Sequence, residues 1–236
     1  MNLLRIDEFK DSLLDYALMT IPVFNDLNDY KRFFIENIHQ GILRCKYKRK
    51  INFTDKLQTL VQDNLFHYSD SLRNKNIKTQ LSYILGELID NIEDHSMALN
   101  GSLSMIYSES EDCLYICVGD NGQTIKGTYE SKAEDPLFRI AANDTAMALK
   151  FSTEGLSTKE LPQHRGYGLS TSIEMIVREL GGSFMILSGS GFFISEESES
   201  DIIQLPDNME FDGTMILIKM PVKEIGNNKL YNIISH

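Results

Sequence analysis

Four side chains that could bind a metal ion or accept a proton lie along GELIDNIEDHS, residues 86–96. Glu87, Asn91 and His95 recur every four residues, and Asp94 precedes the histidine. On a helix this spacing places them along one face. A carboxylate there could serve as a general base for water, and an asparagine amide oxygen is a hard ligand of the kind that Mg²⁺ binds. The pattern is also typical of a solvent-exposed helix face, so the stretch alone leaves both interpretations open.

Three further short stretches could complete a nucleotide site. Asp120 begins a DNG turn after an apolar run, and its carboxylate could accept the exocyclic amine of adenine. Residues 164–170, HRGYGLS, form a glycine-containing turn before an amphipathic pattern, where backbone N–H groups favour an anion. Thr214 opens the last expected strand and could join Asp120 at the adenine through water. Each stretch taken alone is also compatible with an ordinary turn.

The elements that would position these residues predict a two-layer α/β sandwich, in which a mixed or antiparallel sheet carries helices on one face. Apolar periodicity predicts a helix over about 78–99 and a second from the 164–170 turn to Gly181–Gly182. Alternating or continuous apolar runs predict strands over 102–109, 113–120, 183–195 and 213–221. A long irregular segment with one helix is expected over 121–164. The acidic stretch 196–201 favours a solvated hairpin loop.

The first part of the chain predicts a helical N-terminal extension over residues 1–48, followed by one α/β domain over 49–236. The apolar stripe of FKDSLLDYALM would suit either a homodimer contact or packing onto the domain. INFTD, residues 51–55, predicts a short strand that leads into a helix ending near His67. These elements would complete the domain from its N-terminal side.

Composition excludes several classes of function. The 236 residues carry a formal net charge of −11, with a pI near 4.9, so a phosphate backbone would be repelled and no nucleic-acid partner is expected. No apolar run approaches the roughly 20 residues of a membrane span, and the acidic start does not resemble a signal peptide. We therefore expect a cytoplasmic protein with no membrane association. The three cysteines suggest buried reduced thiols rather than a disulfide or metal site.

In this order and spacing, the stretches together resemble the motifs of the GHKL superfamily. This is the Bergerat-type ATP-binding fold of histidine kinases, type II topoisomerase ATPase domains, heat-shock chaperones, mismatch-repair ATPases and anti-sigma-factor serine kinases. The resemblance covers about residues 75–222. The family motif E-x-x-x-N matches Glu87 and Asn91, which implies that Glu87 activates water or a hydroxyl and that Asn91 holds Mg²⁺. His95 matches a histidine of anti-sigma kinases, whereas Asp94 is closer to the topoisomerase pattern.

The remaining motifs match with one departure. D-x-G-x-G is similar to the stretch from Asp120, except that Thr124 replaces the second glycine. G-x-G-L is similar to residues 166–169, and GLSTK, residues 155–159, resembles the phosphate-side lid of sensor kinases. The resemblance implies a set of ATP-binding residues: Asn91, Asp94, His95, Asp120, Gly122, Ser157, Thr158, Lys159, Arg165, Gly166, Tyr167, Gly168, Leu169 and Thr214.

These matches imply an ATP·Mg²⁺-binding regulatory protein that hydrolyses ATP or transfers its γ-phosphate to a regulatory protein partner. The alternative is a catalytically slow, nucleotide-dependent switch, which the Thr124 departure favours slightly. A third interpretation is a scaffold that no longer binds nucleotide. His39 and His67 lack the sequence context of a phosphoacceptor histidine, so a complete sensor histidine kinase is not expected.

Overall fold

The computed structural model describes most of the chain from residue 77 onward. The described ranges are 42–48 (backbone), 77–98, 100–108, 110–158, 168–197, 199–206 and 210–223. The helices expected within residues 1–41, the strand over 51–55 and the helix ending near His67 lie outside these residues. Among the described helices, none has the length and apolar character needed to cross a bilayer.

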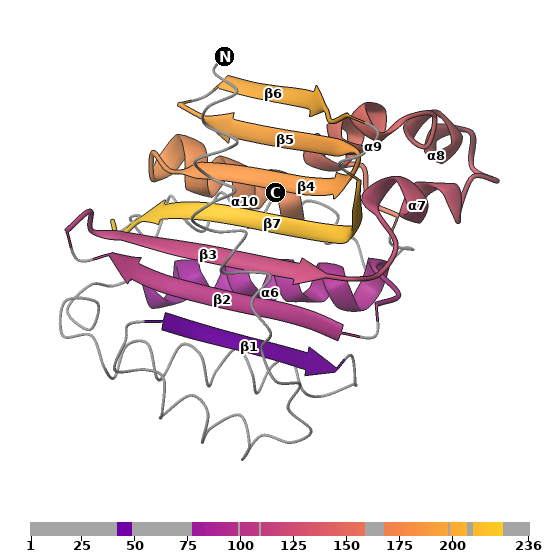
Figure 1. Cartoon of the computed structure of the whole chain (residues 1–236). Coiled ribbons are helices and arrows are strands. Elements are labelled where there is room, and N and C mark those ends of the chain that lie inside the picture. The colour runs from indigo at the N-terminus through magenta and orange to yellow at the C-terminus, as the bar shows by residue number, and fades with distance from the viewer. Residues whose placement is uncertain are drawn as a thin grey trace.

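One antiparallel sheet organises the described part of the chain (Figure 1). Its seven strands lie in the order β1-β2-β3-β7-β4-β5-β6, and each neighbouring pair is antiparallel. Their bounds are β1 Ile42–Lys48, β2 Asn100–Ser108, β3 Cys113–Asp120, β4 Ser183–Gly189, β5 Gly191–Glu196, β6 Glu199–Gln204 and β7 Phe211–Pro221. The last described strand, β7, therefore lies in the interior of the sheet, where it joins β3 to β4.

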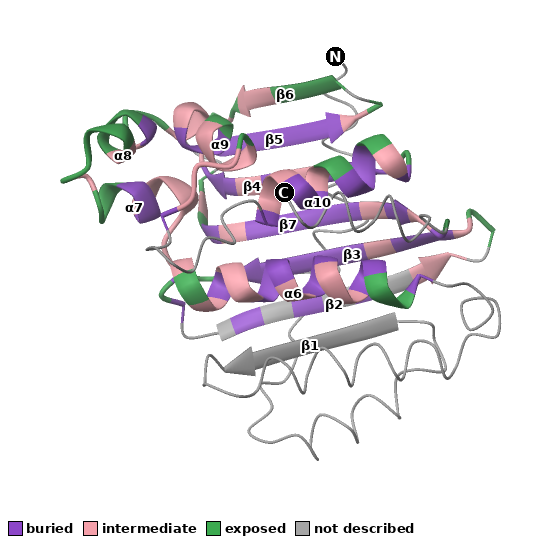
Figure 2. Ribbon diagram, turned by 180° about the vertical axis from the view of Figure 1, so that it is seen from behind, coloured by how far each residue is buried: buried purple, intermediate pink, exposed green. Residues whose placement is uncertain are grey.

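The described helices lie on one side of the sheet, with α7, α8 and α9 gathered at one end (Figures 1 and 2). Their bounds are α6 Lys78–His95, α7 Ile125–Glu130, α8 Pro136–Ala141, α9 Thr145–Thr153 and α10 Gly168–Ile173, which continues as the π-helical turn η3 Glu174–Glu179. The three short helices at the end of the sheet begin at side-chain caps. Thr124, Asp135 and Asp144 accept hydrogen bonds from backbone N–H groups in the first turns of α7, α8 and α9, which satisfies donors that a helix start leaves unpaired.

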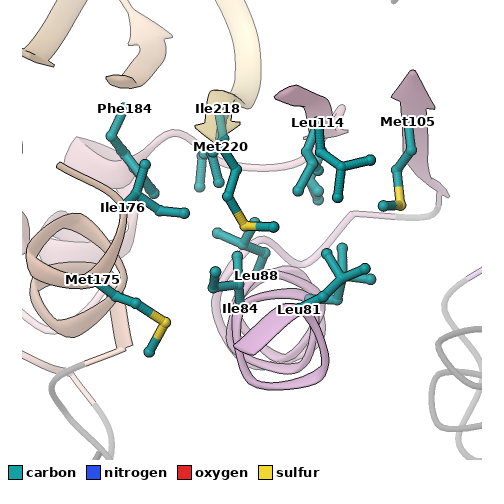
Figure 3. Close-up of a cluster of buried hydrophobic side chains, with 14 of the residues drawn as sticks. Leu81, Ile84, Leu88, Met105, Leu114, Met175, Ile176, Phe184, Ile218 and Met220 are labelled. Atoms are coloured by element: carbon teal, nitrogen blue, oxygen red, sulfur yellow. The ribbon is translucent and has the colours of Figure 1, made fainter. Parts of the chain in front are cut away.

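The main core lies between the helices and the sheet. Figure 3 shows Leu81, Ile84 and Leu88 of α6 pointing toward the strands, with Met175 and Ile176 of η3 beside them. They meet buried side chains of β2, β3, β4 and β7, which include Met105, Leu114, Phe184, Ile218 and Met220. A smaller buried cluster of Cys117, Met215 and Leu217 forms on the opposite face of β3 and β7. Because both faces of these strands are apolar, their sequences are nearly continuous apolar runs.

Several expected elements are confirmed. The strand over 113–120 has the expected bounds, and the last strand begins slightly earlier than expected, at Phe211. The helix expected over about 78–99 begins at Lys78 and ends at His95. Cys113 and Cys117 are buried free thiols, as expected.

Other expectations are wrong. Residues 42–48 form β1 rather than the end of a helix, because they pair with β2 along their whole length. Of the two sheet types expected, the mixed one is wrong and the antiparallel one is confirmed for the described strands, since β7 runs opposite to both of its neighbours. The single strand expected over 183–195 is the β4–β5 hairpin. The acidic stretch 196–201 includes the turn of the β5–β6 hairpin, but it is not all loop, because Glu196 ends β5 and residues 199–201 begin β6. The polar residues of β6 suit an exposed strand at the margin of the described sheet. The one helix expected within 121–164 is three short helices.

Candidate functional site

A cavity is lined by residues from the C-terminal half of α6, the end of β3 and the start of β7. Figure 1 shows these parts of the three elements at the same end of the sheet. The volume of the cavity is about 100 Å³, whereas a single water needs roughly 10–15 Å³, so it can hold a group of many atoms. Apolar side chains of α6, β3 and β7 form part of its wall, namely Leu88, Ile92, Val118 and Ile216. Polar side chains complete the wall: Asn91, His95, Ser96, Asp120, Gln123, Thr128, Ser152, Ser157, Thr158 and Thr214.

Asp120 places a buried carboxylate in the cavity wall. Its residue is 9% exposed, and its Oδ1 accepts a hydrogen bond of 2.8 Å from the Gly122 N–H. Burial raises the pKa of Asp120 from its ordinary value of 3.8 to about 6, although hydrogen bonds from the backbone N–H groups of Gly122 and Thr214 offset part of the rise. At neutral pH the group is therefore mainly ionised and can accept hydrogen bonds from a ligand.

Thr214 lies opposite Asp120 in the register of β3 and β7, and opposite Ser188 in the register of β4 and β7. Its hydroxyl is 3.0 Å from the Ser188 Oγ. Ser188 is fully buried and also contacts the Gly213 carbonyl and the Ile125 N–H. Ser188 was not among the predicted site residues, because its only signal in the sequence is a polar residue inside the apolar run SFMILSG.

The DNG turn packs closely on the C-terminal end of α6. A side-chain carbon at Gly122 would collide with the Ser96 carbonyl, so the turn requires glycine at this position. The Gln123 N–H donates to the same Ser96 carbonyl at 2.6 Å, and the Gln123 side chain donates to the His95 carbonyl at 2.7 Å. Gly122 thus lets the turn between Asp120 and Gln123, which both line the cavity, pack against the end of α6.

Thr124 has a defined structural role at the position where the family motif has its second glycine. Its φ of −70° and ψ of 167° are an ordinary extended conformation, and its Oγ1 accepts a hydrogen bond of 3.0 Å from the Gly127 N–H. The residue therefore begins α7 as an N-cap. Thr124 thus fixes the place where α7 starts.

The residues expected on one face of α6 separate into two groups. Asn91 and His95 line the cavity, and the Asn91 Nδ2 is buried without a hydrogen-bond partner among the described residues. A buried amide N–H in this state is costly unless an acceptor pairs with it. The oxygen of the same amide is the atom that a metal ion would bind. Glu87 is 8% exposed but is not among the described residues that line the cavity. Asp94 is exposed and lies outside the lining as well.

Glu87 lies against the start of α10. A side-chain carbon at Gly168 would collide with the Glu87 Oε2, so glycine at this position gives the carboxylate its space. The family motif implies that this glycine serves close phosphate approach. In this structure the lack of a side chain at Gly168 also leaves space for the carboxylate of Glu87, the expected general base. Gly168 itself lines the cavity.

Residues 156–158 close the cavity on the side of α7. The Tyr129 hydroxyl donates to the Leu156 carbonyl at 2.6 Å, and the Lys132 Nζ donates to the Thr158 carbonyl. The Thr158 Oγ1 is 3.1 Å from the His95 Nδ1. These contacts join the segment both to α7 and to the end of α6.

The structure thus brings together most of the expected site residues that it describes. Those lining one cavity are Asn91, His95, Asp120, Ser157, Thr158, Gly168, Leu169 and Thr214. Lys159, Arg165, Gly166 and Tyr167 lie outside the described residues, and their roles remain predictions. The cavity residues that the sequence analysis did not single out include Gln123, Thr128 and Tyr129, which belong to the turn and helix after the DNG motif.

No protein-family model matches the chain, and no curated protein matches it significantly. The cavity presents an ionised carboxylate and a threonine hydroxyl on the sheet side, and the Asn91 amide and a histidine on the α6 side.

Proposed function

We propose that this chain is an ATP·Mg²⁺-binding regulatory protein with a GHKL-type, Bergerat ATP-binding fold, which hydrolyses ATP or transfers its γ-phosphate to a protein partner. The buried Asp120 carboxylate in the wall of a cavity beside Thr214 is the observation that carries this proposal. Keeping a carboxylate ionised at such a site is costly. A ligand that donates hydrogen bonds to it explains why the cost is tolerated.

The sheet side of the cavity suits the adenine. The Asp120 carboxylate would accept hydrogen bonds from the exocyclic amine, and Thr214 would take part directly or through water. Ile92, Val118 and Ile216 line the same cavity and would cover the apolar faces of the ring. This combination of apolar walls with a few placed polar groups is typical of small-molecule sites.

The α6 side suits the phosphates. Asn91 would hold Mg²⁺ through its amide oxygen, since this ion binds few protein groups and takes its other ligands from water and phosphate oxygens. The ion would supply charge neutralisation for the phosphates. Ser157 and Thr158 line the cavity and would close over the phosphate end, with His95 holding Thr158 in place.

Glu87 is the proposed proton acceptor. In the proposed reaction a hydroxyl oxygen, from water or from a serine or threonine of the partner, attacks the γ-phosphorus. The bond between that phosphorus and the β,γ-bridging oxygen breaks, ADP leaves, and the hydroxyl proton passes to Glu87. Positioning and charge neutralisation would supply most of the acceleration.

A nucleotide-dependent switch is the second candidate, and the position of Glu87 favours it. The carboxylate packs on Gly168 and lies outside the described cavity lining, so it would have to move to reach a nucleophile. The segment over residues 156–158 already contacts α6 and α7. ATP would then reorganise this segment into or out of a docking surface for the partner, with slow or absent hydrolysis.

Calorimetric titration with ATP·Mg²⁺ tests the proposal on wild type, Asp120→Asn and a matched control, Asp201→Asn. Asp201 undergoes the same chemical change on the exposed β6. We expect wild type and Asp201→Asn to bind alike and Asp120→Asn to lose binding while its circular dichroism spectrum stays unchanged. Absence of binding to folded wild type would overturn the proposal.

Turnover separates the two candidates. If Glu87→Gln abolishes hydrolysis or partner phosphorylation but keeps ATP binding, the chain is an enzyme, since a positioned base contributes about 10²–10⁴-fold. If wild type binds ATP without turnover, and ATP changes the proteolytic cleavage of the segment after residue 156, the switch is the correct assignment.

A further inference from the structure

Ser188 is a buried hydroxyl next to the cavity, and the proposed mechanism gives it no task. It lies on β4, opposite Thr214 of β7, and is fully buried. Unlike Thr214, it is not among the described residues that line the cavity. A fully buried hydroxyl has to find its partners within the protein, so its hydrogen bonds can be assigned one by one.

A serine hydroxyl has one hydrogen to donate and two lone pairs that accept. The Ile125 N–H, 2.9 Å away, can only donate and occupies one lone pair. The Gly213 carbonyl oxygen, 3.1 Å away, can only accept and takes the single hydrogen of Ser188. The second lone pair therefore faces the Thr214 Oγ1 at 3.0 Å, and Thr214 has to be the donor in that contact.

The opposite assignment leaves two oxygens without a hydrogen between them. If Ser188 donated to Thr214, its Oγ and the Gly213 carbonyl oxygen would meet at 3.1 Å as two acceptors. A buried contact of that kind is unfavourable. The arrangement therefore fixes the direction of the Thr214 hydroxyl as well as its place.

The direction of this hydroxyl decides what the cavity can recognise. Because the hydrogen of Thr214 points to Ser188, only the lone pairs of its oxygen are available to a ligand. Asp120, ionised at neutral pH, also offers lone pairs. We infer that Ser188 is a specificity-positioning residue, which holds the Thr214 hydroxyl as an acceptor so that the site selects a 6-aminopurine over a 6-oxopurine.

This inference rests on the proposed nucleotide function and adds to it. An exocyclic amine has two hydrogens, one for Asp120 and one for a direct bond to Thr214. A 6-oxo group would instead place an oxygen opposite two acceptors, and sites built to hydrogen-bond one group reject its analogue strongly. Without the Ser188 hydroxyl, Thr214 could rotate its hydrogen toward the cavity and donate to the 6-oxo group.

The test measures dissociation constants for ATP and for inosine triphosphate, each with Mg²⁺, on wild type, Ser188→Ala and Ser190→Ala. Ser190 lies in the neighbouring β4–β5 turn and contacts Gln204, so it serves as a matched control. We expect wild type and Ser190→Ala to prefer ATP by at least about 100-fold. We expect Ser188→Ala to reduce that preference about tenfold, the scale of one hydrogen bond.

A merely structural role for Ser188 predicts a different result. Both affinities would then fall by the same factor and the ratio would not change, which would overturn the inference while leaving nucleotide binding intact. Equal affinity of wild type for the two nucleotides would also overturn it. If wild type binds neither nucleotide, the proposed function fails and the inference fails with it.

A second variant covers the case in which Ser188→Ala does not fold. Thr214→Val keeps the shape of the side chain and removes the hydroxyl whose direction is at issue. We expect its preference for ATP over inosine triphosphate to fall by the same factor as in Ser188→Ala. Full retention of that preference would refute the role assigned to Ser188 and Thr214.

Discussion

The buried carboxylate of Asp120 makes the free energy of unfolding depend on pH, and a substitution at this one residue can measure that dependence. The pKa of Asp120 is about 6 in the folded protein against an ordinary value of 3.8. Because the folded state holds the proton more tightly than the unfolded state, ionisation destabilises the fold. The destabilisation is absent below about pH 4, grows as the pH rises toward 6, and is complete above that value.

Asp120→Asn removes this titration and keeps a side chain of nearly the same shape. Between about pH 4.5 and 7.5 the wild type should lose roughly 2 kcal/mol of unfolding free energy relative to the variant, from the two pKa values and 1.36 kcal/mol per pKa unit. Any constant effect of the amide on the hydrogen bonds from Gly122 and Thr214 cancels in this difference. The variant that abolishes ATP binding should therefore gain stability over wild type as the pH rises.

Urea unfolding at several pH values, without nucleotide, measures the effect. Asp201→Asn is the control, because its exposed side chain should show no such trend. A difference between wild type and Asp120→Asn that varies by less than about 0.5 kcal/mol over this range would refute the reasoning, since that is near the scatter of the method. It would mean that Asp120 is not held in a desolvated position.

Three further predictions concern positions around the cavity. Gly168→Ala should displace the Glu87 carboxylate and lower stability by about 1–3 kcal/mol; an unchanged melting temperature would contradict the close packing. Thr124→Ala should lower the free energy of unfolding by about 1 kcal/mol and Thr124→Gly by only a few tenths, because glycine is a better N-cap than alanine. Urea unfolding measures both, and equal losses would argue against capping. Thr158→Val should speed amide hydrogen exchange of residues 156–158 about fivefold through loss of the contact with His95, as one hydrogen bond implies; unchanged exchange would show that this contact does not hold the segment.

The regular elements of this fold are predictable where one strand or helix has a strong pattern. The strand over 113–120 and the helix from Lys78 have continuous or periodic apolar residues, and both are where the sequence places them. β1 and β6 were missed because their residues form strands only by pairing with β2 and β5. The partner of β1 lies more than 50 residues away in the sequence, and β6 itself begins in an acidic stretch whose composition is typical of loops.

The site was predictable in its residue types and less so in its geometry. Asn91, His95, Asp120 and Thr214 come from three separate elements and line one cavity, in agreement with the helical spacing and the turn motif. Spacing on a helix did not reveal that Glu87 packs on Gly168 or that Asp94 is exposed. The contact between Glu87 and Gly168 depends on where α10 lies against α6, which no local pattern encodes.

The position of β7 also has a consequence for how the chain folds as it is made. It is the last of the described strands to be synthesised, yet it lies between β3 and β4 in the sheet. Until residues 211–221 leave the ribosome, β3 is paired only with β2 and β4 only with β5. One edge of each strand is then unpaired, and unpaired strand edges of this kind invite association with other chains. A stop codon before Phe211 should therefore yield two half-sheets that cannot join, and an aggregating product rather than a smaller domain.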